Sequence, residues 1–181
     1  MKTLFLAGSL VALGAAAGAV AQGPAVPRTA IRSAEQSLDE RLSRIWQDTP
    51  MSLVSRTRGV YLDGYGVVFT ADMNPVSDGI SLMNTRLQPQ QKAQVLQKKI
   101  ARIPELKKAL KEAMMDTAPT LDAVPLDDQL VLEVIIRRFD WEDGGGYPSE
   151  LLLQSTRRKL LDVKRANGVG LEAAVRVTER N

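Results

Sequence analysis

Histidine and cysteine are both absent from the 181 residues, and the two absences exclude much side-chain chemistry. Without histidine, neither Ser-His-Asp nor Cys-His catalysis is available. HExxH metalloprotease sites and histidine-ligated zinc are excluded as well. Without cysteine there are no disulfides, no thiol redox chemistry, no c-type haem attachment and no lipid anchor on a cysteine. A chain of this length can nevertheless build a stable core without disulfides.

Aromatic residues make up only 4% of the chain, so aliphatic side chains must fill most of the core. Apolar residues at 44% and charged residues at 25% are typical of a globular protein and argue against disorder. Phosphate-binding patterns are missing too: the sequence contains no GxxxxGK[ST] and no GxGxxG after a strand. Ser155 and Lys159 do not have the Ser-x-x-Lys spacing of penicillin-binding enzymes.

Residues 1–21 have the pattern of a secretory signal peptide: Lys2, an apolar run over Leu4–Val20, and an A-x-A site ending at Ala21. We expect cleavage between Ala21 and Gln22 and export to a bacterial periplasm or beyond, with no integral membrane segment afterwards. The alternative is an uncleaved anchor, since the run approaches the shortest membrane span. Loss of Lys2 leaves 23 basic and 21 acidic side chains, a net charge of +2 that does not indicate nucleic-acid binding.

The stretch Thr57–Met73 predicts a β-hairpin, because Asp63-Gly64 between two β-type runs suits a tight turn. Val67, Phe69, Ala71 and Met73 alternate with more polar residues and predict one buried face. The glycines around the turn are interpreted as residues that allow a tight, twisted hairpin rather than as a ligand-binding loop. Of Tyr61 and Tyr65, we expect one to face the core and the other a partner.

The rest of the chain predicts one α+β domain over residues 29–181, after a flexible leader over 22–28. We expect an antiparallel sheet of about four to five strands with two main helices packed mostly on one face, in the order α-β-β-α-β-β-(α)-β. The expected helices cover about 29–47, Pro89–Met115 and Arg157–Arg165, and the further strands cover Leu53–Arg58, Gln129–Phe139, Leu151–Ser155 and Ala173–Val177.

The helix over Pro89–Met115 should continue through Pro104 with a kink, because its apolar stripe keeps its phase across the proline. Its many basic side chains are interpreted as a solvated outer face; they are Lys92, Lys98, Lys99, Arg102, Lys107, Lys108 and Lys111. The strand over Gln129–Phe139 has apolar residues on both faces and should be covered on both sides.

Carboxylates are the remaining route to acid–base catalysis, but the sequence shows no pair facing across a cleft. Asp63 suits a turn, Asp72 a solvent-facing strand position, and Glu133 an ion pair with Arg137. The glycine-rich segment Asp140–Tyr147 lacks calcium-loop spacing and predicts a solvated loop. Its Trp141 and Tyr147 either cap the end of the core or dock a partner.

These patterns favour a non-enzymatic, exported interaction or envelope-associated structural module, with no catalytic, cofactor-binding or metal-binding residue assigned. Its expected contact residues are Asp63, Tyr65, Trp141 and Tyr147. The alternative is a histidine-free small-ligand-binding protein or carboxylate-dependent hydrolase, with a site between the 57–73 hairpin and the loop over Asn74–Gln88, lined by Asp63, Tyr65 or Asp72. A third possibility is a sheet edge that pairs with partner chains.

Overall fold

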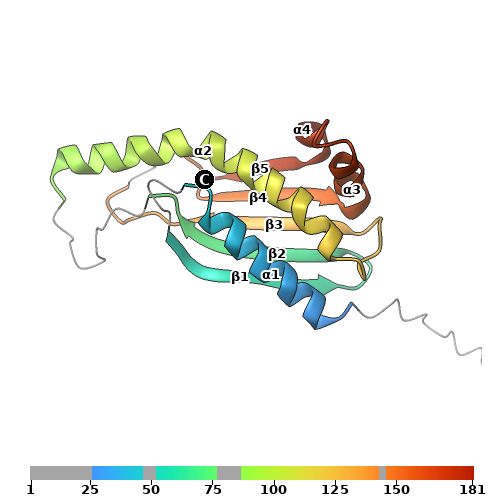
Figure 1. The fold of residues 1–181 in the computed structure, drawn as a ribbon. Helices are drawn as coiled ribbons and strands as arrows, with labels where there is room; N and C mark the ends of the chain where they lie inside the picture. Colours follow the sequence, from blue (N-terminus) through green and yellow to red (C-terminus); the bar gives the residue numbers. More distant parts are fainter. Residues whose placement is uncertain (1–25, 47–51, 77–86, 143–145) are drawn as a thin grey trace, which may run out of the picture.

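A computed structural model describes residues 26–46, 52–76, 87–142 and 146–181. The expected signal peptide with its Ala21–Gln22 cleavage site, most of the leader and most of the loop over Asn74–Gln88 lie outside these residues. The strands are β1 (Ser52–Leu62), β2 (Gly66–Asn74), β3 (Gln129–Ile136), β4 (Glu150–Thr156) and β5 (Arg176–Arg180). They form one five-stranded sheet whose spatial order equals the chain order (Figure 1).

The sheet is mixed: β2 and β3 are parallel, and the other three neighbouring pairs are antiparallel. The parallel pair follows from the long helix between the two strands, which returns the chain to the end of the sheet where β2 began. The α+β prediction and its element order are confirmed, whereas the expectation of a purely antiparallel sheet missed this one crossover.

All helices described lie on the same face of the sheet. They are α1 (Arg28–Ser43), α2 (Pro89–Thr117), the 3-10 turn η1 (Ala118–Thr120), α3 (Arg157–Arg165) and α4 (Leu171–Ala174). Figure 1 shows α1 and α2 crossing in front of the strands, with α3 and α4 at one end. We call the opposite side of the sheet the open face.

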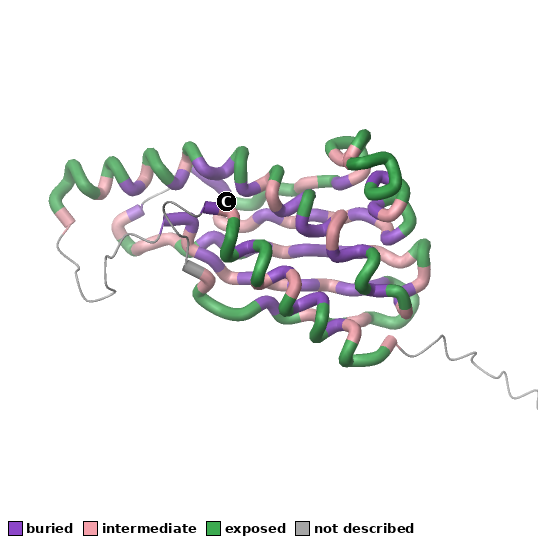
Figure 2. The backbone as a smooth tube through the Cα atoms, in the orientation of Figure 1, coloured by how far each residue is buried: buried purple, intermediate pink, exposed green. Residues whose placement is uncertain are grey.

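The core lies between the helices and the inner face of the sheet (Figure 2). On β2 the four predicted inward residues Val67, Phe69, Ala71 and Met73 are at most 1% exposed. On β3 the inward set is Leu130, Leu132, Val134 and Ile136, each at most 2% exposed. Inward-facing apolar residues thus recur at every second position along β2 and β3. Because the apolar stripes of α1 and α2 pack against them, the helices lie on this face of the sheet.

The long helix α2 begins at Pro89, where a missing N–H is tolerated. Its first turn is closed by a capping box in which the Gln88 N–H donates to Gln91 Oε1 at 2.9 Å. The helix continues through Pro104, as predicted, and its axis changes direction about midway (Figure 1).

Two glycines shape the connection from β1 to β2. The turn has three residues, Asp63–Tyr65, rather than the expected two, and Gly64 has a positive φ of 72°. Gly66 opens β2 at φ 134°, and a Cβ there would lie 2.0 Å from the Gln129 carbonyl oxygen. Glycine is therefore required at 66 for the start of β2 to pair with β3.

Some boundaries differ from the sequence prediction. The first helix ends at Ser43, and β1 is a single long strand with register irregularities between Leu53 and Arg58. The last strand starts at Arg176 rather than Ala173, because residues 171–174 form α4. The antiparallel pairing of β4 with β3 is as expected.

Candidate interaction surfaces

The open face of the sheet carries an unusual share of exposed apolar side chains. In the described residues seven large apolar side chains are exposed, and five of these are Val54, Val60, Leu62, Tyr65 and Ile135, on this face or at its rim. Outer faces of half-buried sheets are normally polar. The expectation that β3 is covered on both sides is wrong for Ile135, which is 42% exposed.

The pairing register groups these residues into a cluster next to the hairpin turn. Val60 lies opposite Val68, which lies opposite Val131 on β3. Leu62 is two residues further along β1, opposite Gly66. Gln154 Nε2 on β4 donates to the Tyr65 hydroxyl at 3.4 Å, so this ring extends across the start of β3. We call Val60, Leu62, Tyr65 and Val68 the open-face patch.

On the open face the acids lie on the middle strands, and the arginines lie on the outer strands or, as Arg137 does, directly after β3. The acids are occupied: Asp72 pairs with Arg137 at 2.8 Å, and Glu150 with Arg180 at 2.8 Å. Glu133 accepts from the Thr70 hydroxyl at 3.0 Å. The expected pair of Glu133 with Arg137 is wrong, because the cross-strand register places each beside a different residue of β2.

The edge strand β1 is capped by side chains of α1. Glu35 Oε1 accepts the Gly59 N–H at 2.8 Å, and Asp39 Oδ1 accepts the Thr57 N–H at 2.8 Å. Arg28 donates to the Gly59 carbonyl at 2.6 Å and pairs with Glu35 at 2.8 Å. These main-chain groups are the ones that an added strand would bind, so α1 closes this part of the edge.

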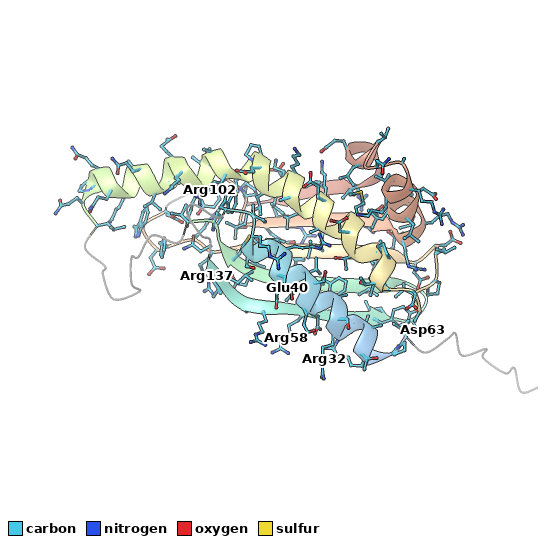
Figure 3. The ribbon with its side chains drawn as sticks, viewed as in Figure 1. Arg32, Glu40, Arg58, Asp63, Arg102 and Arg137 are labelled. Carbon is cyan, nitrogen blue, oxygen red and sulfur yellow. The ribbon has the colours of Figure 1, made fainter. Side chains whose placement is uncertain are left out.

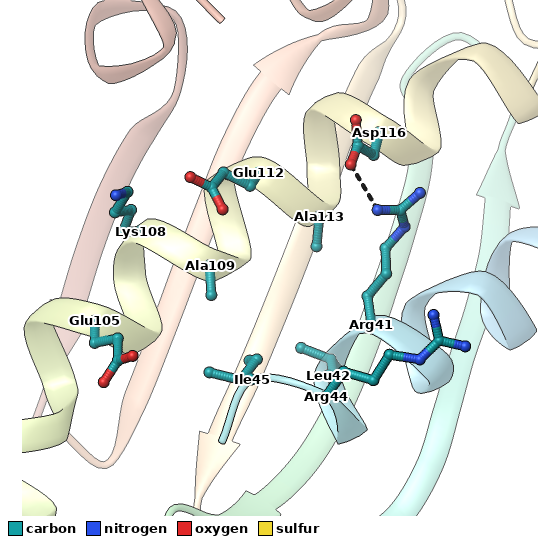
Figure 4. Close-up of a pocket in the computed structure, with 10 residues that line it drawn as sticks. All are labelled: Arg41, Leu42, Arg44, Ile45, Glu105, Lys108, Ala109, Glu112, Ala113 and Asp116. Atoms are coloured by element: carbon teal, nitrogen blue, oxygen red, sulfur yellow. Dashed lines mark hydrogen bonds and ion pairs between the residues drawn. The ribbon is translucent and has the colours of Figure 1, made fainter. Parts of the chain in front are cut away.

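A groove of about 410 Å³ lies between α1 and α2 (Figure 4). Its apolar lining is Leu42, Ile45, Ala109 and Ala113, and its charged lining is Arg41, Arg44, Lys108, Glu105, Glu112 and Asp116. Arg41 donates to Asp116 at 2.6 Å at one end of it. At the other end the Trp46 indole N–H donates to Glu105 at 2.6 Å. The groove is open and amphipathic, with cations and carboxylates in equal number.

A buried polar cluster holds the loop after β3 against α2. Lys99 Nζ lies 2.8 and 2.9 Å from the two carboxylate oxygens of Glu142, and both side chains are fully buried. The Tyr147 hydroxyl donates to Glu142 at 2.6 Å. Burial, and then this hydrogen bond to a carboxylate, raise the pKa of Tyr147. The ammonium also lies 4.6 Å from the Phe139 ring centroid, a favourable cation–π position.

The sequence pattern does not predict this cluster, and the prediction of a solvated position for Lys99 is wrong. Lys99, Arg102 and Lys111 are all at most 9% exposed, whereas Lys98 and Lys108 are exposed as expected. Arg102 donates to the Pro75 carbonyl and stacks 4.6 Å from the Trp46 ring centroid. Only a helical-wheel comparison with Val95, Ile103 and Leu106 could have placed Lys99 on the inward side.

The four expected contact residues fall at two opposite ends of the sheet. Asp63 and Tyr65 are exposed at the hairpin turn, whereas Trp141 and Tyr147 follow β3 at the other end. Figure 3 labels Asp63 at one end of the sheet and Arg137, which directly follows β3, at the other end. Trp141 is half-buried and stacks on Phe139 at 5.5 Å between ring centroids. Tyr147 is 4% exposed.

The two tyrosines of the hairpin face different surroundings. Tyr61 is half-buried against the core and donates to Asp128 at 3.0 Å; burial and then this bond raise its pKa. Tyr65 is 42% exposed. One tyrosine thus faces the core, as the sequence predicted, and the other belongs to the open-face patch.

The groove between α1 and α2 includes none of Asp63, Tyr65 and Asp72. Among the described residues, no group of three or more Asp or Glu side chains is placed to hold a metal ion. No helix in that part of the chain is both long enough and apolar enough to cross a bilayer.

No family model, curated protein or solved structure matches this chain. Function must therefore be argued from the surfaces themselves.

Proposed function

We propose that this chain is an exported, non-enzymatic interaction module that binds a partner protein through its open sheet face. The observation that carries the proposal is that, among the described residues, five of the seven exposed large apolar side chains lie on that face or at its rim, and three of these belong to the open-face patch. Exposed apolar clusters rimmed by polar groups are typical of protein-binding surfaces. Tyr65, an amphipathic residue of the kind enriched in binding sites, lies at the hairpin-turn end of the patch.

Photo-crosslinking tests this function directly. A photoreactive phenylalanine analogue replaces Leu62, which is 46% exposed in the patch, in the full chain expressed in its native cells. Val169, which is 76% exposed in the turn between α3 and α4, provides the matched control position. We expect a protein adduct from position 62 and not from position 169. Equal labelling of both positions, or none at either, contradicts the proposal.

Export has its own test. Amino-terminal sequencing of the protein recovered from the periplasm or medium should begin at Gln22, since Ala19-Val20-Ala21 supplies an A-x-A cleavage site. Cytoplasmic recovery of a chain that retains residues 1–21 contradicts export.

The non-enzymatic part of the proposal has a separate test. It is contradicted if the purified protein turns over members of a panel of glycans and esters and if Asp63→Asn or Asp72→Asn abolishes that turnover.

A second candidate function is the binding of a small ligand, and the α1–α2 groove favours it. Its volume of about 410 Å³ lies in the range of ligand sites, and an apolar floor with paired charges suits an amphipathic zwitterion. The test is Ala109→Trp, which fills the groove, against Ala173→Trp on the exposed surface of α4. Loss of binding in the first variant only, across an amino-acid and short-peptide panel, supports this function.

A further inference from the structure

We propose that the partner of the open face presents carboxylates around an apolar contact, and that it is not a second copy of this chain. This inference rests on the proposed function and specifies its partner. It follows from the charges that surround the open-face patch and from the way in which the edge of β1 is closed.

Three arginines near the two sides of the open face, Arg56, Arg58 and Arg176, lack acidic partners within the described part of the chain, whereas Arg180 on β5 is paired with Glu150. Arg56 and Arg58 are exposed on β1, and neither takes part in an ion pair there. Arg176 on β5 donates only to the neutral amide oxygen of Gln154. The row that contains Val60, Val68 and Val131 continues through Gln154 to Arg176, so the apolar contact has a cation at its far end.

The acids of the same face do not compensate these arginines. Asp72 and Glu150 are already paired with Arg137 and Arg180, and Glu133 lies in the middle of the sheet beside Thr70. A partner that presents carboxylates toward Arg58 and Arg176 gains complementary charge on both sides of the patch. The two flanks lie about four strand spacings apart, roughly 19 Å. Such complementarity selects partners and speeds encounter.

A second copy fits this arrangement poorly. Two sheets that pack face to face keep their strands nearly aligned, so the two-fold axis runs either along the strands or across them. With the first axis, β1 of one copy faces β5 of the other and brings Arg58 near Arg176. With the second, β1 faces β1, and an axis that crosses β1 near Arg58 brings this residue near its own copy. In each of these cases like charges oppose one another in a partly desolvated contact.

Pairing through the edge of β1 is also disfavoured. The N–H groups of Thr57 and Gly59 are already bound by Asp39 and Glu35, and the Gly59 carbonyl by Arg28. A strand added there would have to displace α1. The face, rather than this edge, is thus the accessible surface.

Charge reversal tests the partner's chemistry. The chain with the photoreactive residue at position 62 carries Arg58→Glu and Arg176→Glu, and the matched control carries Lys108→Glu and Lys159→Glu on the helix side. Both changes alter net charge equally. We expect the adduct yield to fall about tenfold, equivalent to about 1.4 kcal/mol, in the first variant only. The crosslinked partner segment should contain Asp or Glu, and binding should weaken with added salt.

The outcomes separate the two proposals. An adduct at position 62 that resists arginine reversal, that joins two copies of this chain, or that carries a basic partner segment overturns the acidic-partner inference and leaves the interaction function standing. Absence of any adduct above that at position 169 overturns the function itself. Circular dichroism checks that the reversed chain is folded, and Arg58→Gln with Arg176→Gln provides a milder pair that should lower the yield in the same direction.

Discussion

Glu35 of α1 occupies the position of a neighbouring strand for Gly59 of β1. Its Oε1 atom accepts the glycine N–H at 2.8 Å, while Arg28 pairs with Glu35 and donates to the carbonyl of the same glycine. A helix carboxylate and a helix guanidinium thus supply the acceptor and the donor that the next β-strand would offer. Close packing supports this arrangement, since a Cβ at Gly59 would lie 2.6 Å from the Phe69 ring.

Glu35→Ala should destabilise the protein and open the edge of β1. Removing the acceptor leaves a strand N–H unsatisfied, at a cost of about 1–3 kcal/mol in the free energy of unfolding. It also exposes main-chain groups to other chains. Urea unfolding measures the first effect and sedimentation of the purified protein at increasing concentration the second. Glu40→Ala, on the exposed side of α1, should change neither. A monomeric, fully stable Glu35→Ala protein contradicts the capping role.

Lys99→Met should cost about 3–5 kcal/mol, because it leaves the Glu142 carboxylate buried without its cation. The double variant Lys99→Met, Glu142→Gln should lose much less than the sum of the two single changes, since no uncompensated charge remains. Denaturant unfolding of the four proteins provides the cycle. Additive losses would show that the two side chains contribute independently despite their 2.8 Å separation.

Tyr147 should make the fold sensitive to alkali. The folded state raises the pKa of its hydroxyl above the unfolded value of about 10, so the folded chain holds this proton more tightly. The stabilisation is complete below pH 10 and declines above it, by up to about 1.4 kcal/mol for each pH unit. Tyr147→Phe should remove this part of the slope between pH 10 and 11.5 while lowering stability at pH 7. Tyr65→Phe, on the exposed patch, is the control.

Local sequence patterns could predict most of the fold for a physical reason. The apolar side chains of α1 and α2 recur at helical spacing, and those of β2 alternate with more polar ones. These patterns show which side of each element is buried, and the buried sides determine how the helices pack on the sheet. The connection between β1 and β2 needs residues with positive φ, and these are the glycines Gly64 and Gly66, which are visible in the sequence. The order of elements therefore follows from the sequence alone.

The sequence does not predict in the same way which side chains contact one another across the sheet or across the core. Lys99 binds a carboxylate 43 residues away, and Arg137 pairs with Asp72 rather than with Glu133. Such choices depend on strand register and on a helix crossing, neither of which leaves a local periodic signal. The open-face patch was only partly foreseen, through Tyr65, because Val60 and Val68 have the same side-chain character as core residues.

Gly66→Ala should disrupt the junction between β2 and β3 far more than Gly64→Ala disrupts the turn. Gly64, with φ 72°, lies in the left-handed region, which costs an L-residue roughly 1–2 kcal/mol, and Gly66, with φ 134°, has a φ that is essentially confined to glycine. At position 64 no atom lies within 4 Å of an added Cβ, so that penalty stands alone. At position 66 the Cβ would lie 2.0 Å from the Gln129 carbonyl oxygen and 2.6 Å from its nitrogen. The two strands must then separate where their parallel pairing begins, and the Gln129 N–H loses its 2.8 Å bond to the Tyr65 carbonyl.

Thermal unfolding should show a small shift for Gly64→Ala and a loss of several kcal/mol in the free energy of unfolding for Gly66→Ala. Amide exchange should place the faster-exchanging residues of the second variant at the start of β3, and equal exchange there in both variants would contradict this assignment.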